Sequence, residues 1–147
     1  MKKSWKYLIV GFSLSVFLFG LSQDAVVVND YDGIKTFGSI ELFLMGGLAI
    51  LGGGLFEWLV WMSNPLYVVA IILFFSNLKG SVIFSINSLI IACSFMNWGE
   101  ILAAENDRNA QILSLGLGYW CWLASISILV LGAGLSLYRE KLTEKVR

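Results

Sequence analysis

The chain lacks most of the residues that usually carry catalysis. Its 147 residues include no histidine, one proline and two cysteines, and only 14% are charged. The absence of histidine removes the commonest transition-metal ligand and excludes serine–histidine and cysteine–histidine nucleophilic sites. Cys93 and Cys121 do not form a C-x-x-C pair and lie within apolar runs, which indicates packing residues rather than a redox centre. We therefore predict that the protein is not an enzyme and needs no cofactor.

Charge is scarcest between residues 36 and 98, where Glu41, Glu57 and Lys79 are the only acidic or basic residues. A soluble domain needs a polar outer surface, whereas a lipid bilayer makes such an apolar composition favourable. The ten basic and ten acidic side chains of the whole chain cancel, so attraction to nucleic acid is not expected. The sequence predicts an integral membrane protein whose main partner is the lipid bilayer.

The apolar residues form segments of a single membrane domain, residues 1–147. These segments cover about residues 7–22, 37–62, 65–78, 81–98 and 112–138. The apolar part of the third, Leu66 to Ser76, would be roughly 17 Å long as a helix, which is short for a span. It reaches full length only by borrowing Trp58 to Met62, with Pro65 as a kink. We predict an all-α bundle of four or five transmembrane helices.

The distribution of charge predicts the topology. Residues 1–6 carry a net charge of +3 and residues 139–147 of +2, whereas residues 23–36 and 99–111 each carry −2. The positive-inside rule then places both ends in the cytoplasm, with the acidic segments on the outer side of the cell membrane. That arrangement needs an even number of crossings. Either the short third segment is re-entrant or interfacial, or five helices cross and the carboxyl end lies outside.

The amino end has two interpretations. Three lysines precede an apolar run at about residues 7–22, which fits either a cleaved signal peptide or a first membrane helix. Gly20 and Ser22 are small residues near its end, but no A-x-A pattern is present and the run is long for a signal peptide. We favour a retained helix with a cytoplasmic amino end.

Small residues recur at helical spacing and predict close contacts between helices. Such stripes are Gly11, Ser15 and Ser22; Ser81, Ser85, Ser88 and Ala92; and Ser114, Gly118, Cys121, Ser125, Gly132 and Ser136. A polar path for a ligand is the alternative, but packing needs no ligand. We interpret these stripes as contacts within a helix bundle.

Two carboxylates are the first candidates for a polar site in the membrane. Glu41 shares a helical face with Met45, Ala49 and Gly52, so it either points at a neighbouring helix or is hydrated at the membrane edge. Glu57, if it lies deep, needs a neutral form or a nearby cation. Lys79 is the only cation in this stretch and the candidate partner, unless it snorkels to the surface.

Two further polar groups are candidates. Asn87 lies in the middle of its apolar segment with Ser94 on the same face, which predicts an interhelical hydrogen bond. Asp24, Asp30 and Asp32 in the first polar segment could bind a cation, but the terminal glutamate of a calcium loop is missing. We expect a solvated loop there.

Two short strings resemble known sequences. W-M-S-N-P (Trp61 to Pro65) and G-Y-W-C-W-L-A-S (Gly118 to Ser125) are similar to segments of small, uncharacterised bacterial multi-pass inner-membrane proteins. The resemblance implies a multi-pass fold and carries no activity or functional residue.

The sequence thus predicts a multi-pass membrane protein of non-enzymatic role. A structural or accessory component, partnered by a second copy or by another membrane protein, is the first hypothesis. A small transporter or channel component that uses an intramembrane carboxylate is the alternative.

Overall fold

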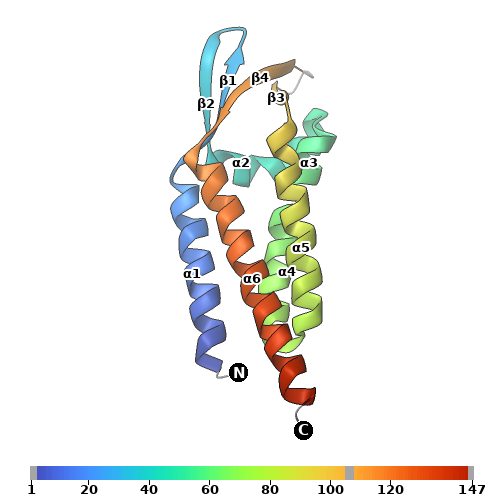
Figure 1. Cartoon of the computed structure of the whole chain (residues 1–147). Coiled ribbons are helices and arrows are strands. Elements are labelled where there is room, and N and C mark those ends of the chain that lie inside the picture. The colour runs from blue at the N-terminus through green and yellow to red at the C-terminus, as the bar shows by residue number, and fades with distance from the viewer. Residues whose placement is uncertain (1–2, 105–107, 146–147) are drawn as a thin grey trace.

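The computed structural model describes residues 3–104 and 108–145, which form a bundle of helices with a small sheet at one end (Figure 1). The elements in chain order are α1 (Lys3–Leu21), β1 (Asp24–Asp30), β2 (Gly33–Gly38), α2 (Ser39–Met45), the 3-10 helix η1 (Gly46–Gly52), α3 (Leu55–Trp61), α4 (Ser63–Ser76), α5 (Leu78–Ser94), the 3-10 turn η2 (Phe95–Asn97), β3 (Glu100–Ala104), β4 (Arg108–Leu115) and α6 (Leu117–Lys145).

Four helical stretches of the described chain are long and apolar enough to cross a membrane. They are Ser4–Leu21, Leu55–Ser76, Leu78–Asn97 and Leu117–Lys145. The first and last described residues lie at the same end of the bundle, opposite the sheet (Figure 1). Four such stretches, with both described ends on one side, are compatible with the even number of crossings that the charge distribution predicts, and the crossing itself stays a prediction.

The third apolar segment gains the length of a membrane span from residues 58–62, the extension that the sequence required for it. The third apolar segment is part of a full-length stretch, because α3 continues into α4 through Met62, whose amide donates to Trp58 O at 3.0 Å. Pro65 has no backbone N–H and cannot donate a helical hydrogen bond to Trp61 O. The Asn64 side chain donates to that carbonyl at 3.1 Å instead.

The prediction of one helix over residues 37–62 is wrong. The chain instead breaks at Gly53, whose φ of +93° is unfavourable for other residues, so that Ser39–Gly52 is a separate short apolar stretch.

The all-α prediction is correct for the bundle and wrong for the two polar segments, which form a four-stranded antiparallel sheet in the order β2-β1-β4-β3. In β1, Val26 and Val28 are fully buried and Val27 between them is partly exposed, the alternation of a half-buried strand. Val28 pairs with Lys35 of β2 and Ile112 of β4. The charged residues between these strands suggested loops, but the β-branched run decides the local structure.

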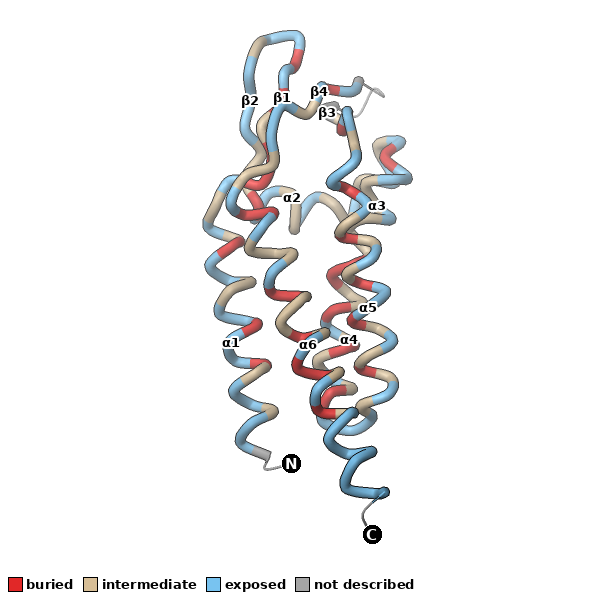
Figure 2. The backbone as a smooth tube through the Cα atoms, viewed as in Figure 1, coloured by how far each residue is buried: buried red, intermediate tan, exposed pale blue. Residues whose placement is uncertain are grey.

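Buried residues follow the axis of the bundle and continue beneath the sheet (Figure 2). The predicted stripe on α5 is confirmed, because Ser81, Ser85, Ser88 and Ala92 are all buried. Of the second long stripe, Gly118, Ser125, Gly132 and Ser136 are buried on α6, with Gly132 against Ile9 of α1. Cys121 is only partly buried, and Ser114 does not belong to the stripe, because it is exposed in β4. The stripe predicted on α1 is wrong, because Gly11, Ser15 and Ser22 are exposed.

Candidate ligand-binding cavity

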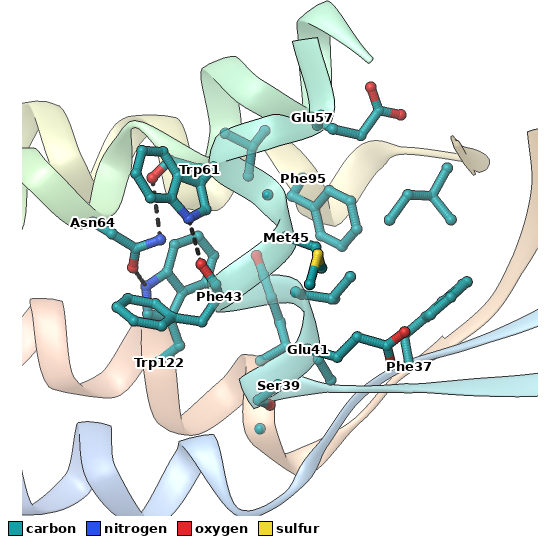
Figure 3. Close-up of a pocket in the computed structure, with 18 of the residues that line it drawn as sticks. Phe37, Ser39, Glu41, Phe43, Met45, Glu57, Trp61, Asn64, Phe95 and Trp122 are labelled. Atoms are coloured by element: carbon teal, nitrogen blue, oxygen red, sulfur yellow. Dashed lines mark hydrogen bonds between the residues drawn. The ribbon is translucent and has the colours of Figure 1, made fainter. Parts of the chain in front are cut away.

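A cavity of about 810 Å³ lies between the bundle and the sheet. Figure 3 shows α2 passing along it, with side chains from several elements pointing inward. Most of its walls are apolar or aromatic, among them Phe17, Phe37, Leu42, Phe43, Met45, Val60, Phe95, Ile101, Tyr119 and Trp122. Pockets of this size with few polar groups are typical of sites for small molecules.

A chain of hydrogen bonds joins four helices at the cavity (Figure 3). Trp122 Nε1 of α6 donates to Asn64 Oδ1 of α4 at 2.9 Å, and Asn64 Nδ2 donates to Trp61 O of α3 at 3.1 Å. The Trp61 indole in turn donates to Phe43 O of α2 at 2.7 Å. Gly46 lies against the Trp61 ring, since an added Cβ would be 2.5 Å from Trp61 Cδ1. The short α2 is therefore held on the bundle in a defined position.

Glu41 lies in the first turn of α2 and lines the cavity together with Met45, Ala49 and Gly52. These are the residues that the sequence placed on one face. The side chain of Glu41 is exposed rather than packed on a neighbouring helix, and within residues 3–104 and 108–145 it makes no hydrogen bond or ion pair. Its carboxylate is thus available at the mouth of an apolar cavity.

Glu57 has a structural partner. It is half-buried in the first turn of α3, and its Oε1 accepts a 2.9 Å hydrogen bond from the backbone amide of Leu102 in β3. The pairing with Lys79 is wrong, because Glu57 lies near the first residue of the 22-residue helical stretch Leu55–Ser76, roughly 30 Å long, whereas Lys79 follows its other end. Glu57 fastens the sheet to the bundle at the cavity.

Lys79 and Asn87 lie away from the cavity. Lys79 is exposed at the start of α5, at the end of the bundle opposite the sheet, as expected for a lysine that snorkels. Asn87 is also exposed, and its Nδ2 donates to Ile83 O of its own helix at 2.8 Å. The predicted hydrogen bond from Asn87 to another helix is therefore not found within the described part of this chain.

Ser39 is a site residue that the sequence did not reveal. Its Oγ is buried beside the cavity and has no hydrogen-bond partner among the described residues. Gly118 of α6 packs directly against it, because a Cβ on this glycine would collide with Ser39 Oγ. A serine beginning a short helix is common and gives no sequence signal of this position. A buried polar atom without a partner is available to a ligand or a water.

The aspartates of the first polar segment pair with a lysine. Lys35 Nζ lies 2.6 Å from Asp30 Oδ2 and 3.2 Å from Asp32 Oδ2. The hydrogen bond to Asp30, followed by that to Asp32, raises the pKa of the Lys35 ammonium above its usual 10.5. In the part of the chain that the structure describes, no cluster of three or more cysteine, aspartate or glutamate residues could hold a metal ion.

The two strings singled out in the sequence meet at this cavity, because Trp61 and Asn64 belong to the first and Trp122 to the second. Their resemblance to bacterial inner-membrane proteins stays a prediction. No family model matches the chain, and neither a curated protein nor a solved structure is similar to it.

Proposed function

We propose that this chain is a non-enzymatic, multi-pass component of a bacterial cytoplasmic membrane whose cavity binds a lipid-like amphiphile with an amine head. The cavity of about 810 Å³, apolar in most of its walls but with a free carboxylate at its mouth, is the observation that carries the proposal. Such walls accommodate an aliphatic chain without the free-energy cost of exposing it to water.

The polar groups of the cavity suggest the chemistry of the head. An ionised carboxylate can accept hydrogen bonds but cannot donate them, and the described residues provide Glu41 with no donor. Ser39 Oγ adds a second unsatisfied group. An amine or ammonium has the donors and the charge that complement both.

The surface near the cavity suggests how such a molecule arrives. Large apolar side chains are exposed along α2, η1 and the start of α3, where they would lie against lipid. They are Ile40, Leu44, Leu48, Leu51 and Phe56. An amphiphile that is already dissolved in the membrane could therefore reach the cavity sideways, without crossing water.

The basic ends favour a cytoplasmic position for both termini, and the first and last described residues lie at the same end of the bundle (Figure 1). The sheet and the cavity would then be on the outer side of the membrane. The proposed ligand is accordingly a component of the outer leaflet or a molecule that reaches it from outside.

A brominated long-chain amine tests this proposal, because bromine quenches nearby tryptophans and Trp61 and Trp122 line the cavity. In nanodiscs, we expect saturable quenching that Ala49→Phe, which places a phenyl ring in the cavity, weakens. Ile50→Phe is the matched control, because Ile50 is the next residue of η1 and is exposed outside the cavity. Equal quenching in the Ala49→Phe variant and the wild type would contradict the proposal.

The head group is tested separately. Glu41→Gln should weaken binding of the amine roughly two- to five-fold, the range for a partly exposed ion pair, and leave binding of the equally brominated alcohol unchanged. Glu140→Gln removes one negative charge from the exposed carboxyl-terminal part of α6 and should change the binding of neither the amine nor the alcohol. Equal loss of alcohol and amine binding in Glu41→Gln would overturn the assignment of an amine.

The alternative function, transport through an intramembrane carboxylate, has weaker support. Glu41 and Glu57 both lie at the sheet end of the bundle, and Glu57 already accepts a backbone hydrogen bond. A carboxylate that carries ions across the membrane would be better placed within the bundle.

A further inference from the structure

Asn87 is the feature from which the inference starts. It lies halfway along the 20-residue stretch Leu78–Asn97, on the outer surface of α5. Its Nδ2 donates one hydrogen bond to Ile83 O, and among the described residues its Oδ1 accepts none. A free amide oxygen and a free N–H are costly in hydrocarbon, where lipid tails offer no partner. This side chain therefore fits a second protein surface better than it fits lipid.

The residues around Asn87 form a regular seam. Ile83, Asn87, Ile90 and Ser94 are spaced by four, three and four residues, and all are exposed. The buried residues of α5, from Ser81 to Ala92, have the same spacing. Each precedes a residue of the exposed seam by two positions, so the two seams lie about 200° apart around the helix. A 3.5-residue repeat is the pattern of a helix that packs along a partner helix. One face of α5 is thus covered by the other helices of its own chain. The opposite face has residues at the same spacing but is exposed.

We propose that a second copy of this chain packs on the outward seam of α5, with the two Asn87 side chains hydrogen-bonded to each other. Two copies of the chain that have the same orientation in the membrane have parallel α5 helices, and these helices lie at the same depth. A two-fold axis normal to the membrane then brings each residue of the seam opposite itself. A carboxamide both donates and accepts, so it is complementary to a copy of itself.

The other seam residues suit this contact. Ser94 Oγ donates to Ile91 O at 2.7 Å and leaves only a small side chain on the seam, which permits close approach. Ile83 and Ile90 supply the apolar contacts on either side of Asn87. A single polar residue within such a seam fixes the register and the number of helices. A different protein would need a matching amide at the same depth, whereas a second copy supplies it by symmetry.

Disulfide crosslinking of the full chain in membranes tests the geometry. In a background with Cys93→Ala and Cys121→Ala, Ile83→Cys and Ile90→Cys should each give a covalent dimer on mild oxidation. Leu131→Cys is the matched control, because Leu131 is similarly exposed on α6 and lies, like Ile83, 14 residues from the sheet end of its helical stretch. Crosslinking of Leu131→Cys as strong as that of Ile83→Cys would overturn the proposed face.

The role of Asn87 is tested by energy transfer between labelled chains diluted in liposomes. Asn87→Leu should weaken dimerisation roughly three- to thirty-fold, the range for interhelical hydrogen bonds in membranes, and Asn87→Gln should restore most of the affinity. Ser15→Ala removes another exposed group that bonds only within its own helix, to Gly11 O at 2.8 Å, and should have no effect. A monomeric wild type, or an Asn87→Leu variant that dimerises normally, would refute the proposal.

Discussion

Trp122 and Asn64 are 58 residues apart in the chain and joined by a 2.9 Å hydrogen bond from the indole Nε1 to the amide oxygen. The Asn64 amide group serves two purposes, because its nitrogen also donates to Trp61 O, the carbonyl that Pro65 cannot satisfy. One side chain thus repairs the helix at the proline and connects α4 to α6. The connection lies at the wall of the cavity, so the packing of the bundle and the shape of the site depend on each other.

Trp122→Phe should lower the free energy of unfolding by about 1–3 kcal/mol, because the buried Asn64 oxygen would lose its donor. The measurement is unfolding of the purified protein in mixed micelles with increasing sodium dodecyl sulfate. Trp120→Phe is the control, because Trp120 is 45% exposed and its indole N–H has no hydrogen bond within the described chain. A loss of stability as large for Trp120→Phe would show that the hydrogen bond is not the cause.

The bundle could be predicted from the sequence because lipid imposes a simple rule, long uncharged stretches of about 20 residues. The stripes on α5 and α6 could be predicted for a similar reason, since small residues at helical spacing permit close contact. The same reasoning failed on α1, where Gly11 and Ser15 face outward. Spacing shows that residues share a face, but it does not show which way that face points.

The cavity could be predicted only in part. Glu41, Met45, Ala49 and Gly52 were placed on one face and do line the cavity. The break at Gly53 was hidden inside an apolar run, because a positive φ depends on tertiary contacts as well as on the presence of glycine. The pairing of β1 with β4 was also hidden, since a contact between distant segments leaves no local periodicity.

Glu57→Ala should free β3 from the bundle, because the Leu102 amide would lose its acceptor. We expect hydrogen exchange of that amide to become roughly five- to thirty-fold faster, the range for loss of 1–2 kcal/mol from a partly exposed hydrogen bond to a charged group. Glu57→Gln keeps an acceptor oxygen and should give a much smaller change. If the Leu102 amide exchanges as slowly in the Glu57→Ala variant as in the wild type, Glu57 does not hold the strand.

Asp30→Asn should lower the pKa of Lys35, because the hydrogen bond to Asp30 is the largest cause of its rise above 10.5. A raised pKa means that the ion pair stabilises the β1–β2 turn fully below pH 10.5, the unfolded value, and that this contribution is lost as the pH rises through the higher folded value. NMR titration of 13C-labelled lysine measures the midpoint. Asp32→Asn should lower the pKa of Lys35 less, because Asp32 Oδ2 is 3.2 Å from Lys35 Nζ and the Asp32 side chain is 71% exposed. A larger fall for Asp32→Asn would contradict the assigned order.

Gly118→Ala should destabilise the junction of α6 with the sheet. The added Cβ would collide with Ser39 Oγ and would lie 2.9 Å from Asp24 O and 3.0 Å from Gln23 O. The two carbonyls belong to the backbone, so the first turn of α6 would have to move. We expect a loss of about 1–3 kcal/mol in the free energy of unfolding, the range for overpacking of a buried site.

The same helix offers a matched control. Gly134 has nothing within 4 Å of an added Cβ, so Gly134→Ala should be neutral or stabilise α6 by up to about 1 kcal/mol through helix propensity. Combining Gly118→Ala with Ser39→Ala removes the hydroxyl collision but keeps both carbonyls, so stability should return only in part. Full recovery in the double variant would mean that Ser39 alone limits the space at Gly118. Equal effects of Gly118→Ala and Gly134→Ala would show that the close contact of α6 with Gln23 and Asp24 does not exist.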